Sequence, residues 1–167
     1  MEDYKKKFQE SEEKFLKIFE ILPNVITISD LENYMIVDVN ENFIILTGLT
    51  RKQALNHTTF DLNLWVDKDD VDWVVTTIKG KSEIKNMELR FRDVNGKILI
   101  GLLSTKIIDI EGKQFLVSSI IDITERKKIE ETLKDKIEEI EKFNKLMVGR
   151  ELKMIELKEK IAKLEQK

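Results

Sequence analysis

The C-terminal quarter of the chain, from Thr124 to Lys167, contains no proline and places apolar residues at seven-residue intervals. One series of such steps contains Leu133, Ile140, Met147, Met154 and Ile161, and a second contains Ile129, Phe143, Leu157 and Leu164. Lys136 and Arg150 are polar exceptions in the second series, and Gly149 is the only glycine. A heptad pattern sustained over this length predicts a coiled-coil helix rather than a helix folded back on a globular core. We therefore expect residues 124–167 to pair two copies of the chain as a parallel homodimer.

A second helical pattern occupies residues 1–22. Its apolar residues recur at helical spacing among lysines and glutamates, and they are Phe8, Phe15, Ile18, Phe19 and Leu22. This spacing predicts an N-terminal amphipathic helix, which ends before Pro23 because proline disfavours helical geometry in the preceding residue. Ile137 and Leu146 widen the apolar face of the C-terminal pattern. A bundle of both helices therefore remains an alternative to a simple coiled coil.

Between these helices, residues 23–123 are rich in β-branched runs separated by turn residues. Five strands are predicted, at Val25–Ile28, Met35–Val39, Met87–Asp93, Ile98–Ile110 and Gln114–Ile121. Asn95-Gly96 predicts a tight hairpin between the third and fourth strands. Short helices are predicted at Lys52–Leu55 and from Lys68 to about Ile78. The fold class is therefore α+β, with helices packed on one face of a sheet.

Composition excludes several classes of protein. A net charge of −3 gives no overall basic field, so no nucleic-acid partner is expected. The absence of cysteine removes disulfides, thiolate nucleophiles and cysteine-ligated metals, and a single histidine removes multi-histidine metal sites. No apolar run approaches the ~18 residues of a membrane span, and the first residues lack the apolar stretch of a signal peptide. We expect a cytoplasmic protein without a membrane span.

Several short motifs occur in a fixed order along residues 15–126. They are Asp38–Phe43 followed by Leu46–Gly48, then Phe60–Asp67, then Glu88–Arg92 before Asn95-Gly96, and finally Asp122–Arg126. In this order the motifs resemble those of the PAS domain family of sensor proteins, and Asp122-Ile123-Thr124 resembles the closing DIT signature of the family. The resemblance implies a five-stranded antiparallel sheet with short helices over one face, and flanking helices that dimerise. Asn40 or Asn42 is expected to cap a helix.

One face of the predicted sheet could form a ligand pocket. Alternation places Met87, Leu89 and Phe91 on one side of their strand, opposite Glu88, Arg90 and Arg92. The resemblance implies that the same face receives Leu103, Thr105, Leu116, Ser118 and Ile120. This mostly apolar wall suits a small-molecule pocket, and equally a filled core, which is the favoured interpretation. Met87 draws attention because a flexible thioether fills irregular space. Phe60, Trp65 and Trp73 are expected to be packing residues.

The sequence predicts neither catalysis nor a resident cofactor. The ligand histidine of haem-binding PAS domains lies on the helix before the central strands, and residues 69–74 contain none. His57, the only histidine, is therefore expected at the surface or a helix start. The flavin-binding members use a cysteine, which this chain lacks, and a glutamine where Ile120 stands. Asp67, Asp69, Asp70 and Asp72 do not follow a calcium-loop spacing. Haem, flavin and metal are therefore disfavoured, and the chain is not expected to be an enzyme.

The last predicted strand is followed by the C-terminal helix without a flexible linker. Asp122 stands three residues before Glu125, the spacing of a capping box, and Thr124 is a second possible cap. We expect Asp122, Ile123 and Thr124 to form a junction whose polar side chains bind backbone N–H groups. The predicted function is a sensory and dimerisation module that passes a signal through the coiled coil to an effector. A stand-alone small-molecule receptor and a ligand-free assembly module are the alternatives.

The expected effector is a sensor histidine kinase. Kinases of this kind carry a phospho-accepting histidine after such a helix, and no histidine follows His57. The chain is therefore expected to be a fragment of a kinase or a stand-alone PAS protein. The stimulus is not specified by the sequence.

Overall fold

The computed structural model describes residues 2–165, of which the side chains at residues 2–4, 8 and 162–165 are not described. The chain divides between Thr124 and Glu125 into two compact units. The first unit contains all five strands and four of the five helices, and the second is a single long helix. The predicted α+β class is confirmed.

The five strands form one antiparallel sheet with the order β2-β1-β5-β4-β3. They are β1 (Val25–Asp30), β2 (Ile36–Val39), β3 (Glu83–Arg92), β4 (Ile98–Ile110) and β5 (Lys113–Asp122). The strand that precedes the C-terminal helix therefore lies at the centre of the sheet, between β1 and β4.

Strand β3 begins earlier than Met87, where the sequence prediction placed its start. The pairing with β4 shifts register between Ile84 and Met87, which marks a β-bulge. Asn86 adopts a left-handed backbone with φ of 52°, and its N–H donates to Ser104 Oγ at 3.0 Å. The bulge lets the strand continue through the polar Lys85-Asn86 pair, which interrupts the alternation that defines a strand in the sequence.

The turn between β3 and β4 is also longer than the predicted tight hairpin. It spans Asp93–Lys97, and Gly96 supplies the left-handed conformation with φ of 80°. The Asp93 carboxylate accepts hydrogen bonds from the N–H groups of Asn95 (2.8 Å) and Lys97 (2.9 Å). These bonds satisfy backbone donors that a two-residue turn would pair with the opposite strand, so the longer turn is stable.

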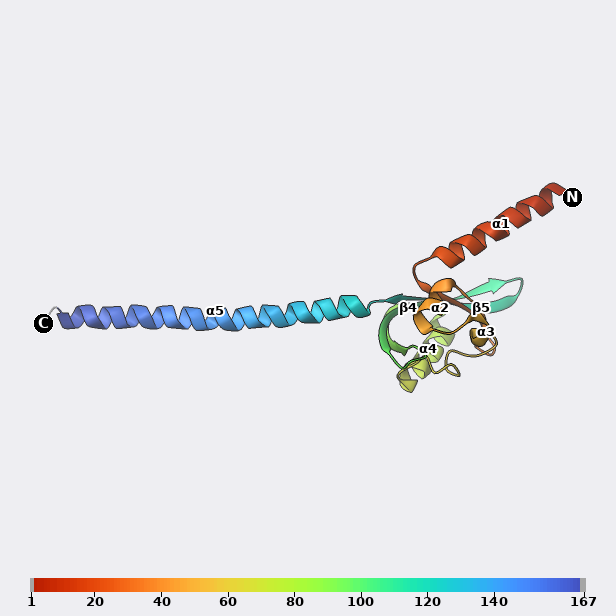
Figure 1. Cartoon of the computed structure of the whole chain (residues 1–167). Helices are drawn as coiled ribbons and strands as arrows, with labels where there is room; N and C mark the ends of the chain where they lie inside the picture. The colour runs from red at the N-terminus through yellow and green to blue at the C-terminus, as the bar shows by residue number, and fades with distance from the viewer. Residues whose placement is uncertain (1, 166–167) are drawn as a thin grey trace. The chain divides into compact units, whose positions relative to one another are not determined.

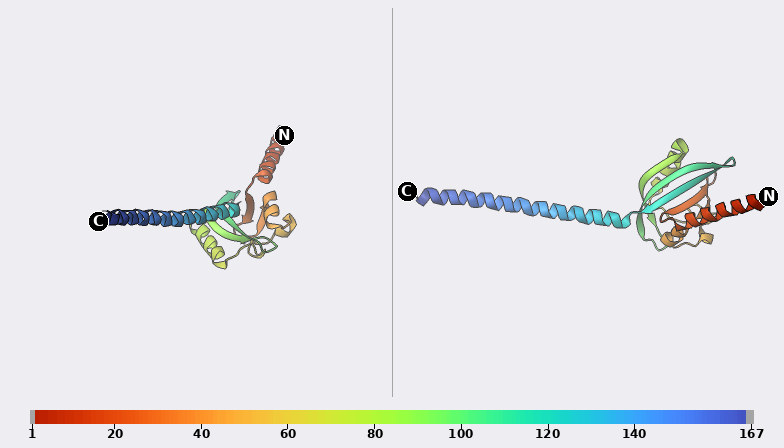
Figure 2. Two further views of the ribbon diagram at one scale, coloured as in Figure 1. Left: turned by 60° about the vertical axis from the view of Figure 1, so that its left-hand side comes forward. Right: turned by 90° about the horizontal axis from the view of Figure 1, so that it is seen from above.

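Three short helices lie on one face of the sheet (Figures 1 and 2). They are α2 (Glu41–Thr47), α3 (Arg51–Ala54) and α4 (Lys68–Lys81). The core beneath them consists of two hydrophobic clusters. One joins β1 and β2 to α2 and α3, and contains Val25, Ile36, Val39, Phe43, Leu49, Ala54 and Leu64. The other joins β3 and β4 to α4, and contains Val74, Ile78, Ile84, Leu89, Phe91 and Leu103. The space between the clusters is where a cavity can form.

Asn40 joins β1, β2 and α2 through one fully buried amide. Its side-chain oxygen accepts from the N–H groups of Ile26 (2.9 Å) and Phe43 (3.2 Å), and its amide nitrogen donates to the Asn24 carbonyl (2.8 Å). The bond to Phe43 is the helix cap of α2, so Asn40 is the predicted cap. Asn42 instead donates its side-chain amide to the Leu22 carbonyl.

The N-terminal helix α1 (Glu2–Ile21) is attached to the first unit through its last turn. The Glu20 carboxylate pairs with the guanidinium of Arg51 at the start of α3, and accepts from the N–H of Glu41 in α2 at 2.7 Å. Arg51 also pairs with Asp38 of β2 at 2.6 Å. Charge-assisted bonds of this kind are stronger than neutral ones, so they fix the C-terminal end of α1 to α2 and α3, and Arg51 links α3 in turn to β2.

Helix α5 runs from Thr124 to Glu165, and all of it after Thr124 lies in the second unit. All the predicted seam residues with described side chains, Ile129, Leu133, Ile140, Phe143, Met147, Met154, Leu157 and Ile161, are exposed, with exposed fractions between 43% and 61%. Leu164 lies outside the described side chains. No described helix combines the length and apolar character that crossing a membrane requires. The described part of α5 therefore carries a stripe of exposed apolar side chains.

Candidate functional site: a pocket above the centre of the sheet

The centre of the sheet presents small residues to the helices. Thr27 of β1 and Ser118 of β5 are direct neighbours, and Gly101 of β4 lies on the same face. A cavity of about 230 Å³ lies above these three residues. Larger residues from both hydrophobic clusters, including Phe43, Leu64, Val74, Ile78 and Leu103, form its sides. The pocket therefore exists because the sheet is lined with small side chains where the two clusters meet.

Gly101 is required for the shape of this pocket. A Cβ atom at residue 101 would lie 2.6 Å from Ile120 Cγ2 and 2.8 Å from the ring of Phe91. Gly101→Ala is expected to lower the free energy of unfolding by about 1–3 kcal/mol, the usual cost of overpacking a core. Urea unfolding measures this change in the free energy of unfolding. Gly80→Ala is the matched control, because nothing lies near its Cβ in α4, and it should raise stability by up to about 1 kcal/mol. Equal stability of Gly101→Ala and the wild type would contradict this packing.

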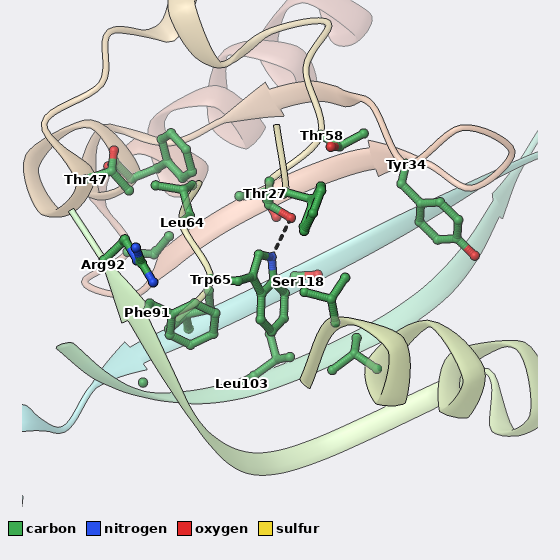
Figure 3. Close-up of a pocket in the computed structure, with 18 of the residues that line it drawn as sticks. Thr27, Tyr34, Thr47, Thr58, Leu64, Trp65, Phe91, Arg92, Leu103 and Ser118 are labelled. Carbon is green, nitrogen blue, oxygen red and sulfur yellow. Dashed lines mark hydrogen bonds between the residues drawn. The ribbon is translucent and has the colours of Figure 1, made fainter. Parts of the chain in front are cut away.

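The loop before α4 covers the pocket with Trp65. The indole Nε1 donates to the hydroxyl of Thr59 at 2.9 Å, the dashed line in Figure 3, and the ring lies 5.0 Å from that of Phe91. Earlier in this loop, the N–H and hydroxyl of Thr58 donate to the Asp61 carboxylate, at 3.0 and 2.8 Å. These bonds hold the pKa of Asp61 below its ordinary value. The loop is thus tied by its own polar groups, and Trp65 is held over the cavity.

Five of the eight predicted wall residues line the cavity. They are Phe91, Leu103, Leu116, Ser118 and Ile120. Met87 and Leu89 do not line it, because Val74 and Ile78 of α4 cover that part of β3 and the side chains pack into the second cluster. Thr105 is buried outside it, where its hydroxyl donates to the Val117 carbonyl at 3.1 Å and lies 2.9 Å from Ser118 Oγ. Met87 therefore lies outside this cavity, and its suggested role in filling irregular space stays a prediction.

Sequence alternation also misplaced Arg92, which it assigned to the opposite face of β3. Arg92 lines the pocket, and Figure 3 shows it with Thr47 at the opposite end from Tyr34. The backbone N–H of Arg92 donates to the Leu64 carbonyl at 2.8 Å, and its Nη2 donates to the Val66 carbonyl at 3.2 Å. The segment beside β3 thus holds this long side chain at the pocket. The only sequence feature that pointed to Arg92 as a pocket residue was its place at the end of a predicted strand.

The pocket extends to the residues that precede α5. Asp122, two positions after Ile120 on β5, is one of the lining residues. Its carboxylate accepts from the N–H of Thr124 at 2.8 Å, and the Thr124 hydroxyl accepts from the N–H of Ile100 on β4 at 2.8 Å. The buried Ile123 donates its N–H to the Ile100 carbonyl. Both polar side chains bind backbone N–H groups, as expected, so the junction is fastened to β4.

The detailed cap geometry differs from the predicted capping box. The Asp122 carboxylate reaches the N–H of Thr124 instead of Glu125, and the Thr124 hydroxyl is used by β4 instead of the helix. The difference arises because β5 continues to Asp122, so the chain turns at this residue before α5 begins. The junction therefore stabilises the end of the sheet.

The remaining polar candidates lie away from the pocket. His57 is exposed, with Nδ1 3.0 Å from the Leu55 carbonyl, and is not a lining residue. In the acidic cluster, Asp67 pairs with Arg90 at 2.8 Å. Within residues 2–165, no group of three or more histidine, aspartate or glutamate side chains is arranged to hold a metal ion.

The chain belongs to the PAS family, whose model, described as the PAS fold, matches residues 13–123. PAS domains are, as a class, sensory modules rather than enzymes. The chain is 29% identical over 129 residues to the sensor protein TdiS of Thauera aromatica, a match covering 73% of this chain and 23% of that protein. The chain thus spans about a quarter of the length of this relative.

Solved structures share the fold at low sequence identity. The PAS domain of an HTR-like protein from Haloarcula marismortui has a TM-score of 0.63 at 20% identity, and covers 74% of this chain and all of its own. A PAS domain from a two-component sensor histidine kinase has a TM-score of 0.58 at 20% identity, and covers 68% of this chain and 98% of its own. At such identities these likenesses concern the fold alone. The sensory PAS fold predicted from the motifs is confirmed.

Proposed function

We propose that the chain is the input module of a cytoplasmic signalling protein, in which a small molecule in the pocket alters how two α5 helices pair. The observation that carries the proposal is the continuity of β5. Ser118, Ile120 and Asp122 line the pocket on one strand, and Asp122 binds the N–H of Thr124, the first residue of α5. A ligand that displaces β5 would therefore move the residues from which the helix starts.

Homodimerisation through α5 is supported by its exposed apolar stripe. Burying such side chains stabilises association by roughly 25 cal/mol per Å² of apolar surface. Two features make the pairing adjustable. Gly149 lowers helix propensity by about 1 kcal/mol relative to alanine, and Met147 and Met154 on either side of it pack permissively. Two helix packings that differ by only a few kcal/mol are what a switch requires.

The proposed effector is a histidine kinase. The support is the likeness to a sensor protein and to the PAS domain of a two-component sensor histidine kinase. The order of elements agrees with this role, since α5 follows the sheet directly and would carry a change in pairing to a domain beyond it. Pairing of this module with a kinase would be a property of the whole protein, and we include it in this proposal.

We also propose that the pocket works without haem or flavin. A volume of about 230 Å³ is below the ~300–1,000 Å³ of pockets for drug-sized ligands, and both cofactors are larger than the molecules it would hold. Ile120 presents a hydrocarbon side chain, and His57 lies outside the pocket. An absorbance spectrum of the purified protein tests the proposal, because a visible cofactor band would overturn it.

Cysteine crosslinking tests the pairing and its response to the pocket. The chain has no cysteine, so Leu157→Cys introduces a single thiol on the seam, and Leu164→Cys a second choice. Either variant should form a disulfide-linked dimer readily, whereas Leu152→Cys, off the seam, should do so at least about tenfold more slowly, because disulfides need Cα atoms within about 7 Å. Equal rates at residues 152 and 157 would contradict this pairing.

Because the ligand is unknown, Ser118→Leu can replace it by filling the pocket from β5. Combined with Met147→Cys, this change should alter the rate of crosslinking severalfold if the pocket and the helices are coupled. Gly80→Ala in the same background is the control, since residue 80 is not among the lining residues and a Cβ there would meet no other atom within 4 Å. An unchanged rate in a folded Ser118→Leu variant would instead support a ligand-free assembly module, the alternative favoured by the exposed stripe alone.

A further inference from the structure

Arg92 brings a cation to a pocket that is otherwise mostly apolar. Of the residues that line the cavity, two are charged, Arg92 and Asp122. One oxygen of the Asp122 carboxylate accepts from the N–H of Thr124. Figure 3 shows the guanidinium beside Phe91, near Thr47, with the aliphatic and aromatic wall extending from it towards Tyr34. The pocket therefore has one cationic end and a long apolar side.

The guanidinium of Arg92 is incompletely paired. Its Nη2 donates to the Val66 carbonyl at 3.2 Å, whereas its Nε atom is buried and has no hydrogen-bond acceptor among the described residues. Arg92 makes no ion pair with any residue that the structure describes. A buried donor without an acceptor destabilises a fold and calls for an explanation. Here the missing partner is an acceptor, and most naturally an anion.

The carboxylate next to Arg92 in the chain is used elsewhere. Asp93, the next residue, has its carboxylate in the β3–β4 turn, where it accepts from the N–H groups of Asn95 and Lys97. Arg90, on the same strand, differs from Arg92 in having an ion-pair partner, since it pairs with Asp67 on the surface at 2.8 Å. Arg92 is thus held at the pocket by a neutral carbonyl, and no ion pair joins it to a residue that the structure describes.

We propose that the pocket selects a compact, largely apolar organic acid whose carboxylate pairs with Arg92. This inference rests on the proposed function and specifies its ligand class. A guanidinium presents parallel N–H groups that match the two oxygens of a carboxylate. The hydrocarbon part of such a ligand would lie against the apolar wall, which includes Trp65 and Leu103. The volume limits the ligand to a small one, since an apolar cavity of about 150 Å³ holds benzene.

Matched pairs of compounds test the charge requirement in the full chain. The probes are hexanoate and cyclohexanecarboxylate, each with its primary amide, which has nearly the same shape without the charge. At least one acid should raise the melting temperature and bind by calorimetry at least about tenfold more tightly than its amide, as a charge-assisted bond allows. If the amides bind as tightly as the acids, or if neither acid binds, the inference is overturned.

Substitutions of Arg92 test the residue itself. Arg92→Met keeps the apolar stem and removes the donors, so it should weaken acid binding by about 10- to 100-fold and leave amide binding unchanged. The melting temperature without ligand should be equal or higher, because the unpaired donor is gone. Arg92→Lys should retain part of the preference for acids, and Arg90→Met should retain all of it.

The failure of this inference is distinguishable from that of the proposed function. If Arg92→Met lowers the melting temperature while acid binding is retained, Arg92 only fastens the Val66 segment and the inference is overturned. The coupling of pocket to helices is measured separately, by crosslinking of the Met147→Cys variant with and without Ser118→Leu. A pocket that accepts neutral molecules would thus overturn the ligand class and leave the signalling proposal standing.

Discussion

Replacing Asn40 with alanine is expected to lower the free energy of unfolding by about 3–5 kcal/mol, the largest stability effect we predict for one side chain. The amide accepts from two backbone N–H groups and donates to a carbonyl, all at a fully buried position. Its removal leaves the Ile26 N–H and the Asn24 carbonyl without these partners, at about 1–3 kcal/mol each, and α2 loses its side-chain cap, although the Phe43 N–H keeps a bond to the Asn40 backbone carbonyl. Urea denaturation followed by circular dichroism measures the change.

Asn42→Ala is the matched control for this prediction. Asn42 makes one side-chain hydrogen bond, to the Leu22 carbonyl at an exposed position, so its loss should cost less than about 1 kcal/mol. If the two variants were equally stable, Asn40 would be an ordinary helix cap. Its bond to Ile26 would then contribute nothing to joining β1 with α2.

Replacing Ile140 with aspartate is expected to turn a dimer into a monomer. The exposed stripe of α5 pairs in our proposal with its copy, so this change places two carboxylates in one apolar seam. Leaving a charge buried without a partner costs several kcal/mol, which raises the dimer dissociation constant by about a hundredfold or more. Sedimentation over a range of protein concentrations measures the dimer dissociation constant. Helicity should fall as well, because a solvated single helix derives little stability from propensity alone.

Val148→Asp provides the comparison on the same helix. Val148 is apolar and exposed but stands one position after the seam residue Met147. The same new charge at this position should leave the dissociation constant within about threefold of the wild type, as exposed surface changes usually do. A wild-type chain that sediments as a monomer at all concentrations would refute dimerisation through α5.

The sequence predicted most of the elements because each has a local cause. The bounds of β4 agree with its apolar run, α4 begins at Lys68 as its pattern indicated, and Asn40 caps α2 by a bond to a residue three positions away. Such features depend on residues close together in the chain. The same locality explains why the bond from the Ile26 N–H to Asn40 was not predicted, since it joins residues fourteen positions apart.

The pocket was predicted less completely, because a strand's alternation assigns a face and not a place on it. Met87 and Phe91 lie on the same face of β3, yet α4 covers the first and leaves the second at the cavity. Trp65 reaches the pocket from a loop, and Arg92 through the length of its side chain. Loop paths and long side chains are set by tertiary packing, which no spacing rule encodes.

The bulge at Asn86 has a consequence for how this protein meets other chains. β3 is an outer strand of the sheet, and such strands expose backbone groups that can recruit a foreign strand and begin aggregation. The bulge interrupts the regular backbone at one end of β3, and Trp65 forms a bridge to Phe91 that occupies the other. With β3 protected in this way, growth of the sheet by strand addition is discouraged at this edge.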